Sequence, residues 1–214
     1  GVLGDNIRFD YGKMLSRKKK VVRKLVSGVE SKMKVNRVTV IKGDAHVEKR
    51  SSEGIEVTCN GERFTGRNLL VCTGSESAVP PIPGLKEAGD VVVTNREILE
   101  MTDRPKSLVV IGGGVIGMEF ASFYNSLGTE VTVVEMLPEI LAGMDLEISS
   151  ALRDIYSKKG ITFHLNAKVV QVDGNKVTFE KEGTTHTIEG EKITLTVENA
   201  DGDSLLQLSG KQLV

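Results

Sequence analysis

Short uncharged runs of hydrophobic residues alternate with helical stripes in the second half of this chain. Residues 107–111 and 131–134 contain no charged side chain and predict strands buried on both faces, as in a parallel sheet. Between them, residues 115–127 are apolar on almost every side of a helix, and Gly128 follows as a stop signal. A strand, a helix and a second strand in this order predict an α/β fold.

The remaining pattern of the second half extends this sheet and adds another. Thr94 begins a short helix that Pro105 terminates, and Asp145 caps a longer helix that stops at Gly160. The apolar spacing of the longer helix predicts one stripe: Ile148, Leu152, Ile155 and Tyr156. Residues 161–165 predict a third strand of the parallel sheet. Three further runs predict a β-meander: 169–172, 176–180 and 193–197.

The first half predicts one amphipathic helix followed by short strands. Apolar side chains in residues 13–34 repeat at helical spacings, and Asp10 is a candidate cap. Asn60-Gly61 is a strong signal for a two-residue hairpin. Four runs predict the strands of an antiparallel meander: 38–41, 45–48, 55–59 and 68–72. A helix and an open meander bury little surface, so we expect this half to be unstable by itself.

The stiff stretch 79–84 contains three prolines and separates two predicted domains, 1–80 and 81–214. Three glycines in the second of these, Gly112, Gly114 and Gly117, match Gly-x-Gly-x-x-Gly at a strand-to-helix turn. The first permits the tight turn, the second lets a diphosphate approach the backbone, and the third lets helix and strand pack closely. The free N–H groups of the following helix attract the phosphates.

The context of these glycines favours a dinucleotide site over a glycine-rich turn of some other α/β domain. Glu135 ends the second strand, eighteen residues after Gly117, where a carboxylate can accept hydrogen bonds from the adenosine ribose. A 2′-phosphate there would meet like charge, and residues 136–138 provide no arginine to receive it. The sequence therefore predicts NAD rather than NADP.

Composition restricts the class of protein. The chain has 214 residues, 39% of them hydrophobic and 27% charged, and no uncharged run approaches the length of a membrane span. Two cysteines are too few for a disulfide framework and favour a reducing compartment, so we expect the cytoplasm or, in a eukaryote, the mitochondrial matrix. No Cys and His cluster suggests a metal site.

Positive charge is concentrated in residues 1–50, which contain fourteen lysines and arginines against five acidic residues. The run 17–20 is either a nucleic-acid-binding arm or the solvated face of a helix. The second interpretation is favoured because the charges interleave with regular apolar positions. We therefore expect neither a nucleic acid nor a membrane as partner.

Several motifs resemble those of the dihydrolipoamide dehydrogenases, which are disulfide oxidoreductases with two dinucleotide-binding domains. The match extends in register over about residues 1–190. The second half contributes 111–119, Glu135, the run 141–148 and Lys159-Gly160-Ile161. The first half contributes 21–29, 41–45, Thr73-Gly74-Ser75 and 80–84.

The resemblance implies an α/β fold in which a Rossmann-like NAD-binding domain, with a three-layer sheet and a β-meander, follows part of an FAD-binding domain. Electrons would pass from dihydrolipoyl groups through a disulfide and FAD to NAD. The implied NAD contacts are Gly112, Gly113, Gly114, Val115, Ile116, Gly117, Met118, Glu119, Glu135 and Val169. The implied FAD contacts are Ala45, Thr73, Gly74 and Ser75. The implied partners are lipoyl-bearing subunits of 2-oxo acid dehydrogenase complexes and, in the full-length protein, a second copy.

Glu119 is the one charged residue between Lys106 and Glu130. In the family's motif this glutamate lies near the junction of flavin and nicotinamide. The alternative is a carboxylate stabilised by the helix dipole in an early turn.

The family's FAD glycine motif, redox disulfide and C-terminal domain with its catalytic His and Glu have no counterpart here, so no catalytic residue is assigned. Because residues from Thr194 onward depart from the pattern, we expect the strand that ends in Gly-Arg-x-Pro to be absent. The expected molecule is an internal fragment, truncated or aberrant after about residue 193 and inactive alone. Alternatives are a related glutathione- or mercuric-reductase-like enzyme and a non-catalytic NAD-binding or inert remnant.

Several residues imitate functional groups. Cys59 and Cys72 lie in different predicted strands, thirteen positions apart, and are interpreted as buried structural cysteines rather than a redox pair. The spacing of His186 and Glu191 matches the family's His-x-x-x-x-Glu by chance, because it falls in a threonine-rich hairpin. The other two histidines, His46 and His164, are interpreted as strand residues rather than acid–base catalysts.

Overall fold

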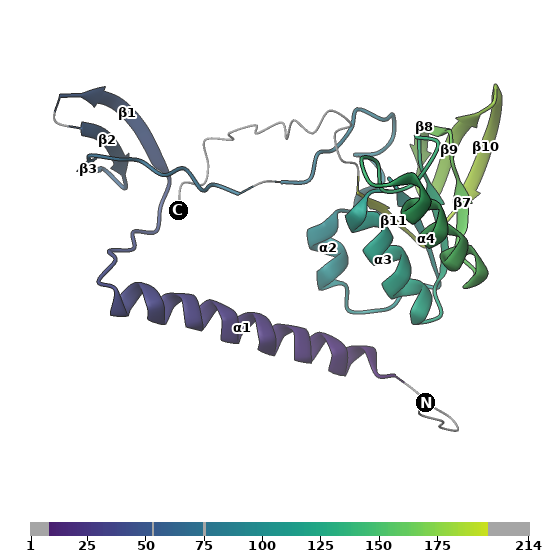
Figure 1. The fold of residues 1–214 in the computed structure, drawn as a ribbon, viewed down its shortest axis with the longest axis horizontal. Helices are drawn as coiled ribbons and strands as arrows, with labels where there is room; N and C mark the ends of the chain where they lie inside the picture. Colours follow the sequence, from purple (N-terminus) through teal and green to yellow (C-terminus); the bar gives the residue numbers. More distant parts are fainter. Residues whose placement is uncertain (1–8, 53, 75, 197–214) are drawn as a thin grey trace. The chain divides into compact units, whose positions relative to one another are not determined.

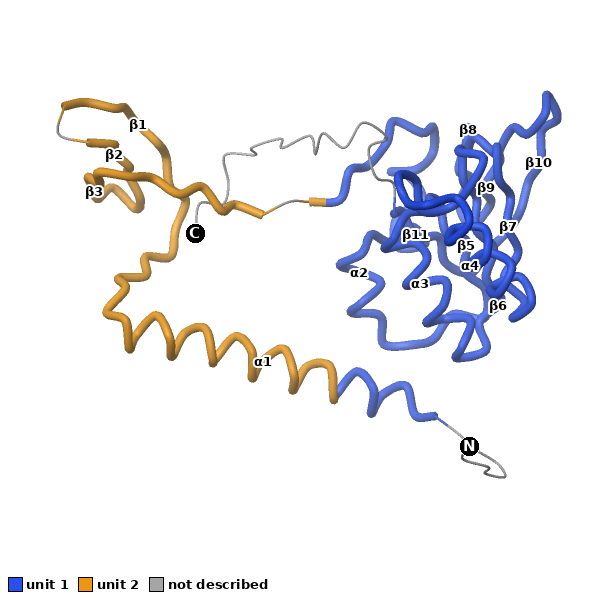
Figure 2. Tube along the Cα trace, in the orientation of Figure 1, with its two compact units in different colours: residues 1–16, 77–202 blue, residues 17–76, 203–214 orange. Residues whose placement is uncertain are grey.

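The computed structural model describes residues 9–52, 54–74 and 76–196. These residues form two compact units, coloured separately in Figure 2. One unit contains the described part of residues 77–202 with residues up to 16, and the other contains the described part of residues 17–76. Each unit is described by itself below.

Helix α1 (Tyr11–Val35) confirms the helix predicted over 13–34. The N–H of Lys13 donates to the Asp10 carboxylate at 2.9 Å, which confirms the predicted cap. No residue of α1 is buried, and Leu25 in the middle of the apolar stripe is 65% exposed. The stripe therefore contributes no core within the described residues.

A three-stranded antiparallel sheet follows α1 and lies in the unit that contains the described part of residues 17–76. Its strands, in order, are β1 (Ala45–Ser51), β2 (Gly54–Cys59) and β3 (Glu62–Gly66). The predicted hairpin is confirmed, because Cys59 pairs with Glu62 and both Asn60 and Gly61 have positive φ (52° and 80°). The strands predicted over 38–41 and 68–72 are wrong. Both runs are exposed and pair with no strand of the described residues, so their backbone groups complete no ladder.

The larger unit is built on a five-stranded sheet in which all neighbouring strands run parallel. Its order is β4 (Val92–Val93), β11 (Lys192–Leu195), β5 (Ser107–Ile111), β6 (Glu130–Val134) and β7 (Thr162–His164). The parallel strands predicted at 107–111, 131–134 and 161–165 are confirmed.

Strand β11 corrects two expectations. Residues 193–197 were predicted as the last meander strand, but β11 lies between β4 and β5 in the parallel sheet. The strand expected to be absent after residue 193 is therefore present as far as Leu195. The physical reason is burial on both faces, since Ile193, Thr194 and Leu195 are at most 2% exposed.

The meander is a separate antiparallel sheet with the order β8 (Ala167–Asp173), β9 (Lys176–Lys181) and β10 (Thr184–Glu189). Its third strand is the threonine-rich segment that contains His186. The two sheets and the helices form three layers, which agrees with the predicted fold class (Figure 1). Leu108 and Val110 of β5 face the helices, whereas Val109 and Ile111 face the meander, because side chains alternate along a strand.

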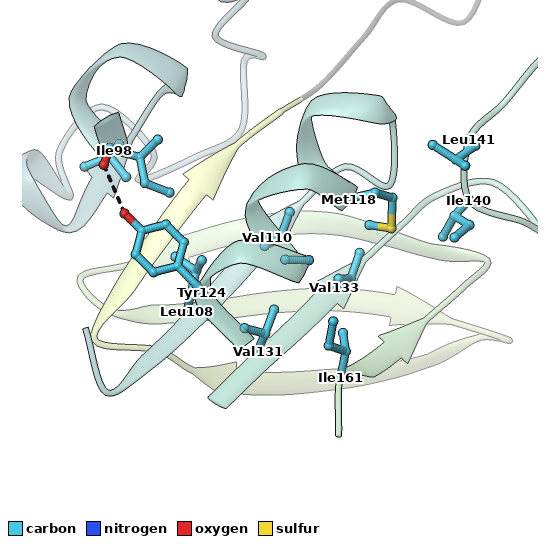
Figure 3. Close-up of a cluster of buried hydrophobic side chains, with 12 residues drawn as sticks. Ile98, Leu108, Val110, Met118, Tyr124, Val131, Val133, Ile140, Leu141 and Ile161 are labelled. Atoms are coloured by element: carbon cyan, nitrogen blue, oxygen red, sulfur yellow. Dashed lines mark hydrogen bonds between the residues drawn. The ribbon is translucent and has the colours of Figure 1, made fainter. Parts of the chain in front are cut away.

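Three α-helices cover the other face of the parallel sheet: α2 (Asn95–Glu100), α3 (Val115–Ser126) and α4 (Leu146–Lys158). A short 3₁₀ segment, η1 (Gly89–Val91), precedes β4. Thr94 caps α2 in a capping box with Glu97, but the helix ends at Glu100, well before the predicted stop at Pro105. In Figure 3 the Tyr124 hydroxyl of α3 donates to the Ile98 carbonyl of α2 at 3.0 Å.

Helix α4 begins as predicted, because the Asp145 carboxylate accepts from the N–H of Glu147 at 2.9 Å. Its predicted apolar stripe is partly wrong. Ile148 and Ile155 are 59% and 49% exposed, whereas the helix buries Ser149 and packs Leu152 and Tyr156 on the core. Positions 149, 152 and 156 share one helical face. Among the described residues, no helix combines the length and hydrophobicity that crossing a membrane requires.

One buried hydroxyl in this core generates a stability prediction. Thr194 is fully buried in β11, and its Oγ1 has no hydrogen-bond partner among the described residues. An unsatisfied buried hydroxyl costs about 1–3 kcal/mol. Thr194→Val keeps the side-chain shape and removes the hydroxyl, so we expect the free energy of unfolding to rise by about 1 kcal/mol in urea denaturation.

Thr129→Val is the matched control. Thr129 is 2% exposed, but its hydroxyl donates to the Pro105 carbonyl at 2.8 Å. The same substitution should therefore lower the free energy of unfolding by about 1 kcal/mol there. A destabilised Thr194→Val variant would contradict the assignment of an unpaired hydroxyl.

A second prediction concerns pH. Burial lowers the pKa of His164 in β7, and the charges of Lys181 and His186 act in the same direction. As the pH falls, the unfolded chain therefore takes up this proton first, at a pH of about 6.5. The free energy of unfolding of this unit should be highest above that pH. It should decrease as the pH drops from there through the lower folded-state pKa of His164.

Melting temperatures between pH 7.5 and pH 5.5 test this expectation. We expect the melting temperature to fall with the pH, and His164→Gln to reduce that fall. His46→Gln, in β1 of the other unit, is the control. It should leave unchanged the slope of melting temperature against pH for the larger unit. If the melting temperature falls with pH equally steeply in the wild type and in His164→Gln, His164 does not cause the pH dependence.

Candidate dinucleotide-binding site

A cavity of about 840 Å³ opens where β5 and β6 end at their carboxyl ends. Its walls are formed by the glycine turn after β5, the end of β6 with the residues that follow it, the beginning of β8 and the stretch Pro80–Pro83. Open α/β sheets bind ligands at this edge, and the volume lies in the usual range of ligand sites. All the described residues that line the cavity belong to the larger unit.

The glycine turn requires its first and third glycines. Gly112 has φ +108°, and its N–H donates to the Val134 carbonyl at 3.0 Å, so the turn stays joined to β6. A Cβ atom at Gly112 would lie 2.7 Å from the Thr196 carbonyl oxygen. A Cβ atom at Gly117 would lie only 2.2 Å from the Gly112 carbonyl oxygen. Helix α3 can therefore begin directly at the end of β5 only without side chains at these positions.

Gly114 is the N-cap residue of α3 and lines the cavity. It has no side chain to accept hydrogen bonds from the N–H groups of the first turn, and that turn contains no acidic residue. A helix N-terminus with free N–H groups at a cavity wall attracts an anionic group such as a diphosphate.

The Glu135 carboxylate is held at the wall by two backbone groups. Its Oε2 accepts from the N–H of Gly113 at 2.5 Å, and its Oε1 accepts from the N–H of Leu137 at 2.7 Å. The Leu141 N–H donates to the Gly113 carbonyl at 2.8 Å and fixes this residue from the other side. A carboxylate has about four lone-pair sites, so Glu135 can still accept from a ligand hydroxyl.

The structure brings part of the predicted NAD set to this cavity. Four members line it: Gly112, Gly114, Glu135 and Val169. Gly113 adjoins it through Glu135, Gly117 and Met118 are buried beneath the turn, and Ile116 is half-buried. Val115 and Glu119 lie on the exposed side of α3, one turn apart.

The predicted FAD contacts lie in the smaller unit. Ala45 is the first residue of β1, and Thr73 and Gly74 lie in the irregular segment after β3. Ser75 lies outside the described residues. The described members of this set, Ala45, Thr73 and Gly74, are not among the residues that line the cavity.

Three cavity-lining features were not assigned to the site from the sequence. The stretch Pro80–Pro83, predicted as a connection, packs on β8, where the N–H of Val172 donates to the Pro83 carbonyl at 2.9 Å. Lys168 adds a cation to the wall, and the hydroxyl of Thr196, which directly follows β11, donates to the Gly112 carbonyl of the turn at 2.9 Å. The prolines carried a usable signal, since a stiff extended segment can form a wall, but no local pattern marks Lys168 or Thr196.

The cysteines and the His186–Glu191 pair, whose spacing resembles that of functional groups, have other environments in the structure. Cys59 is buried as predicted, but Cys72 is exposed, because the strand expected around it does not form. The His186 ring stacks on Phe179 with centroids 5.3 Å apart. The Glu191 carboxylate accepts from the Lys106 N–H at 2.7 Å, where β11 joins β5. Within the described residues, no group of three metal-ligating side chains is present.

Comparisons with known proteins agree with this geometry. The family model described as pyridine nucleotide-disulphide oxidoreductase matches residues 4–205. Dihydrolipoyl dehydrogenase of Acholeplasma laidlawii is 42% identical over 193 residues, which cover 89% of this chain and 56% of the relative. Dihydrolipoamide dehydrogenase of Chaetomium thermophilum is 36% identical over 205 residues, which cover 92% of this chain and 40% of the relative.

A similar solved structure is the Cu(II) complex of RclA, an HOCl-induced flavoprotein disulfide reductase from Escherichia coli. It has a TM-score of 0.73 and 25% sequence identity, over 88% of this chain and 42% of that one. The chain thus spans about half the length of the relatives it matches. The motifs, the fold and the matched model agree, and the chain belongs to the pyridine nucleotide-disulphide oxidoreductase family.

Proposed function

We propose that the larger unit binds NAD and that the chain forms the middle part of a dihydrolipoamide dehydrogenase. In such a protein, electrons would pass from dihydrolipoyl groups through a disulfide and FAD to NAD. The observation that supports NAD most strongly is the Glu135 carboxylate, held 2.5 Å from the Gly113 N–H beside the free N-terminus of α3. The names of the relatives support the dihydrolipoyl substrate.

The residues of this chain would bind and orient the cofactor, while bound NAD supplies the hydride-accepting ring. The N–H groups at the start of α3 and the bare backbone of Gly114 would hold the diphosphate. Glu135 would accept hydrogen bonds from the adenosine ribose, and Val169 would pack near the adenine. Glu119, on the exposed side of α3, would lie toward the nicotinamide.

The charge of Glu135 would select NAD over NADP. A 2′-phosphate on the ribose would lie within a few ångströms of the carboxylate, where like charges repel. Lys168 also lines the cavity, on β8. The residue type at the end of β6 therefore favours the cofactor without the phosphate.

The smaller unit would belong to an FAD-binding domain, with Ala45, Thr73, Gly74 and Ser75 along the flavin cofactor. We place the boundary between the two domains at residues 80 and 81, near the division into compact units. The partners would be lipoyl-bearing subunits of 2-oxo acid dehydrogenase complexes and a second copy of the whole protein. The chain alone would carry out no sustained turnover, because no redox-active disulfide or catalytic base is assigned in it.

A related disulfide reductase is the second candidate. The similarity to RclA, whose name describes a flavoprotein disulfide reductase, favours it. Both candidates share the NAD site, and they differ in the substrate that reacts at the redox disulfide. Assays of a full-length protein with dihydrolipoamide, glutathione disulfide and mercuric ion would separate them.

Calorimetric titration of the chain with NADH and NADPH tests the proposed site. We expect NADH to bind at least tenfold more tightly than NADPH. Glu135→Gln removes the charge at nearly constant shape, so it should weaken NADH binding and narrow the difference between the two cofactors.

Glu130→Gln is the matched control, because Glu130 is an exposed glutamate at the opposite end of the same strand. It should leave both dissociation constants unchanged. Absence of NADH binding to a folded wild-type chain would favour the inert remnant. Equal binding of NADH and NADPH by the wild type would refute the role of Glu135.

A further inference from the structure

We infer that Thr196 is a positioning residue of the NAD site, whose hydroxyl fixes the peptide group between Gly112 and Gly113. This inference rests on the proposed NAD binding and adds to it a residue that lies outside the glycine motif, just after β11. Thr196 directly follows β11, lines the cavity and is 6% exposed.

Thr196 contacts the end of β5 through both its backbone and its side chain. Its N–H donates to the Ile111 carbonyl at 3.0 Å and continues the pairing of β11 with β5. Its Oγ1 lies 2.9 Å from the Gly112 carbonyl oxygen and 3.3 Å from that of Ile111. A hydroxyl carries one proton, and the shorter distance assigns the hydrogen bond to Gly112.

The same peptide group is held at its other end by Glu135. The carbonyl of Gly112 accepts from Thr196, and the N–H of Gly113, in the same planar unit, donates to the Glu135 carboxylate at 2.5 Å. Thr196 and Glu135 therefore act on opposite ends of one rigid peptide plane. The orientation of the ribose-binding carboxylate and that of the glycine turn are coupled through it.

This peptide needs external support because it lies between two glycines. Glycine adopts positive and negative φ with similar ease, so the local backbone of these two residues does not by itself fix the plane. A rotation of the plane would turn the Gly112 carbonyl oxygen away from Thr196 and withdraw the Gly113 N–H from Glu135. Both changes would weaken the binding of a diphosphate and a ribose at this edge.

Hydrogen exchange of the Gly113 amide tests the positioning without any cofactor. The expected result is faster exchange in Thr196→Val than in the wild type, because the plane loses its anchor. Thr196→Ser keeps the hydroxyl and should restore slow exchange. Thr194→Val is the matched control, since it makes the same substitution two residues earlier in a buried strand position without a hydrogen bond to the turn.

Calorimetric titration with NADH then measures the consequence for binding. Thr196→Val should raise the dissociation constant about fivefold to tenfold, the size expected for one lost hydrogen bond, while Thr196→Ser and Thr194→Val stay within twofold of the wild type. Glu135→Gln and Thr196→Val should be non-additive when combined, because both act on one peptide.

The outcomes separate the two proposals. If the folded wild type does not bind NADH, the proposed function fails, while the exchange data still report on Thr196. If the wild type binds NADH and the dissociation constant of Thr196→Val is within twofold of the wild-type value, the inference is overturned. The inference is also overturned if Thr196→Ser binds NADH as weakly as Thr196→Val does. If Thr196→Val does not fold, Thr196→Ala removes the same hydroxyl with a smaller side chain.

Discussion

The close approach of Gly117 to the Gly112 carbonyl is the contact on which the rest of the site depends. A Cβ atom at position 117 would lie 2.2 Å from that oxygen, so only glycine lets α3 start directly at the end of β5. This start brings the free N–H groups of the helix to the cavity wall, beside the carboxylate at the end of β6. A shift of the helix by the width of a methyl group would separate the N-terminus of α3 from this carboxylate.

The surrounding fold makes that contact rigid. The parallel sheet is buried by helices on one face and by the meander on the other, and β5 contributes side chains to both cores. Close packing on both sides leaves the turn little freedom to relax. The smaller unit has almost no core of this kind, because Cys59 is the single buried hydrophobic residue among its described positions. The lining of the cavity, as far as the structure describes it, accordingly lies in the larger unit.

The sequence predicted the parts of this structure whose causes are local. The glycines require one turn geometry, the uncharged runs require burial on both faces, and Asn60-Gly61 requires a hairpin, so all three were identified correctly. Strand β11 was misplaced, because a short apolar run fits a meander as well as a parallel sheet until its neighbours are known. Thr196 could not be found for the same reason, since its contact with Gly112 joins residues 84 positions apart.

We propose that one glycine turn and one carboxylate bind the diphosphate and ribose of NAD. An NMR titration of the isotope-labelled chain with NAD⁺ tests it most directly, because each backbone amide reports separately. We expect the largest amide shifts on residues 112–117 and 135–137, with little change in α1 or β10. Shifts concentrated on α1 or β10, with the turn unchanged at saturating NAD⁺, would contradict it.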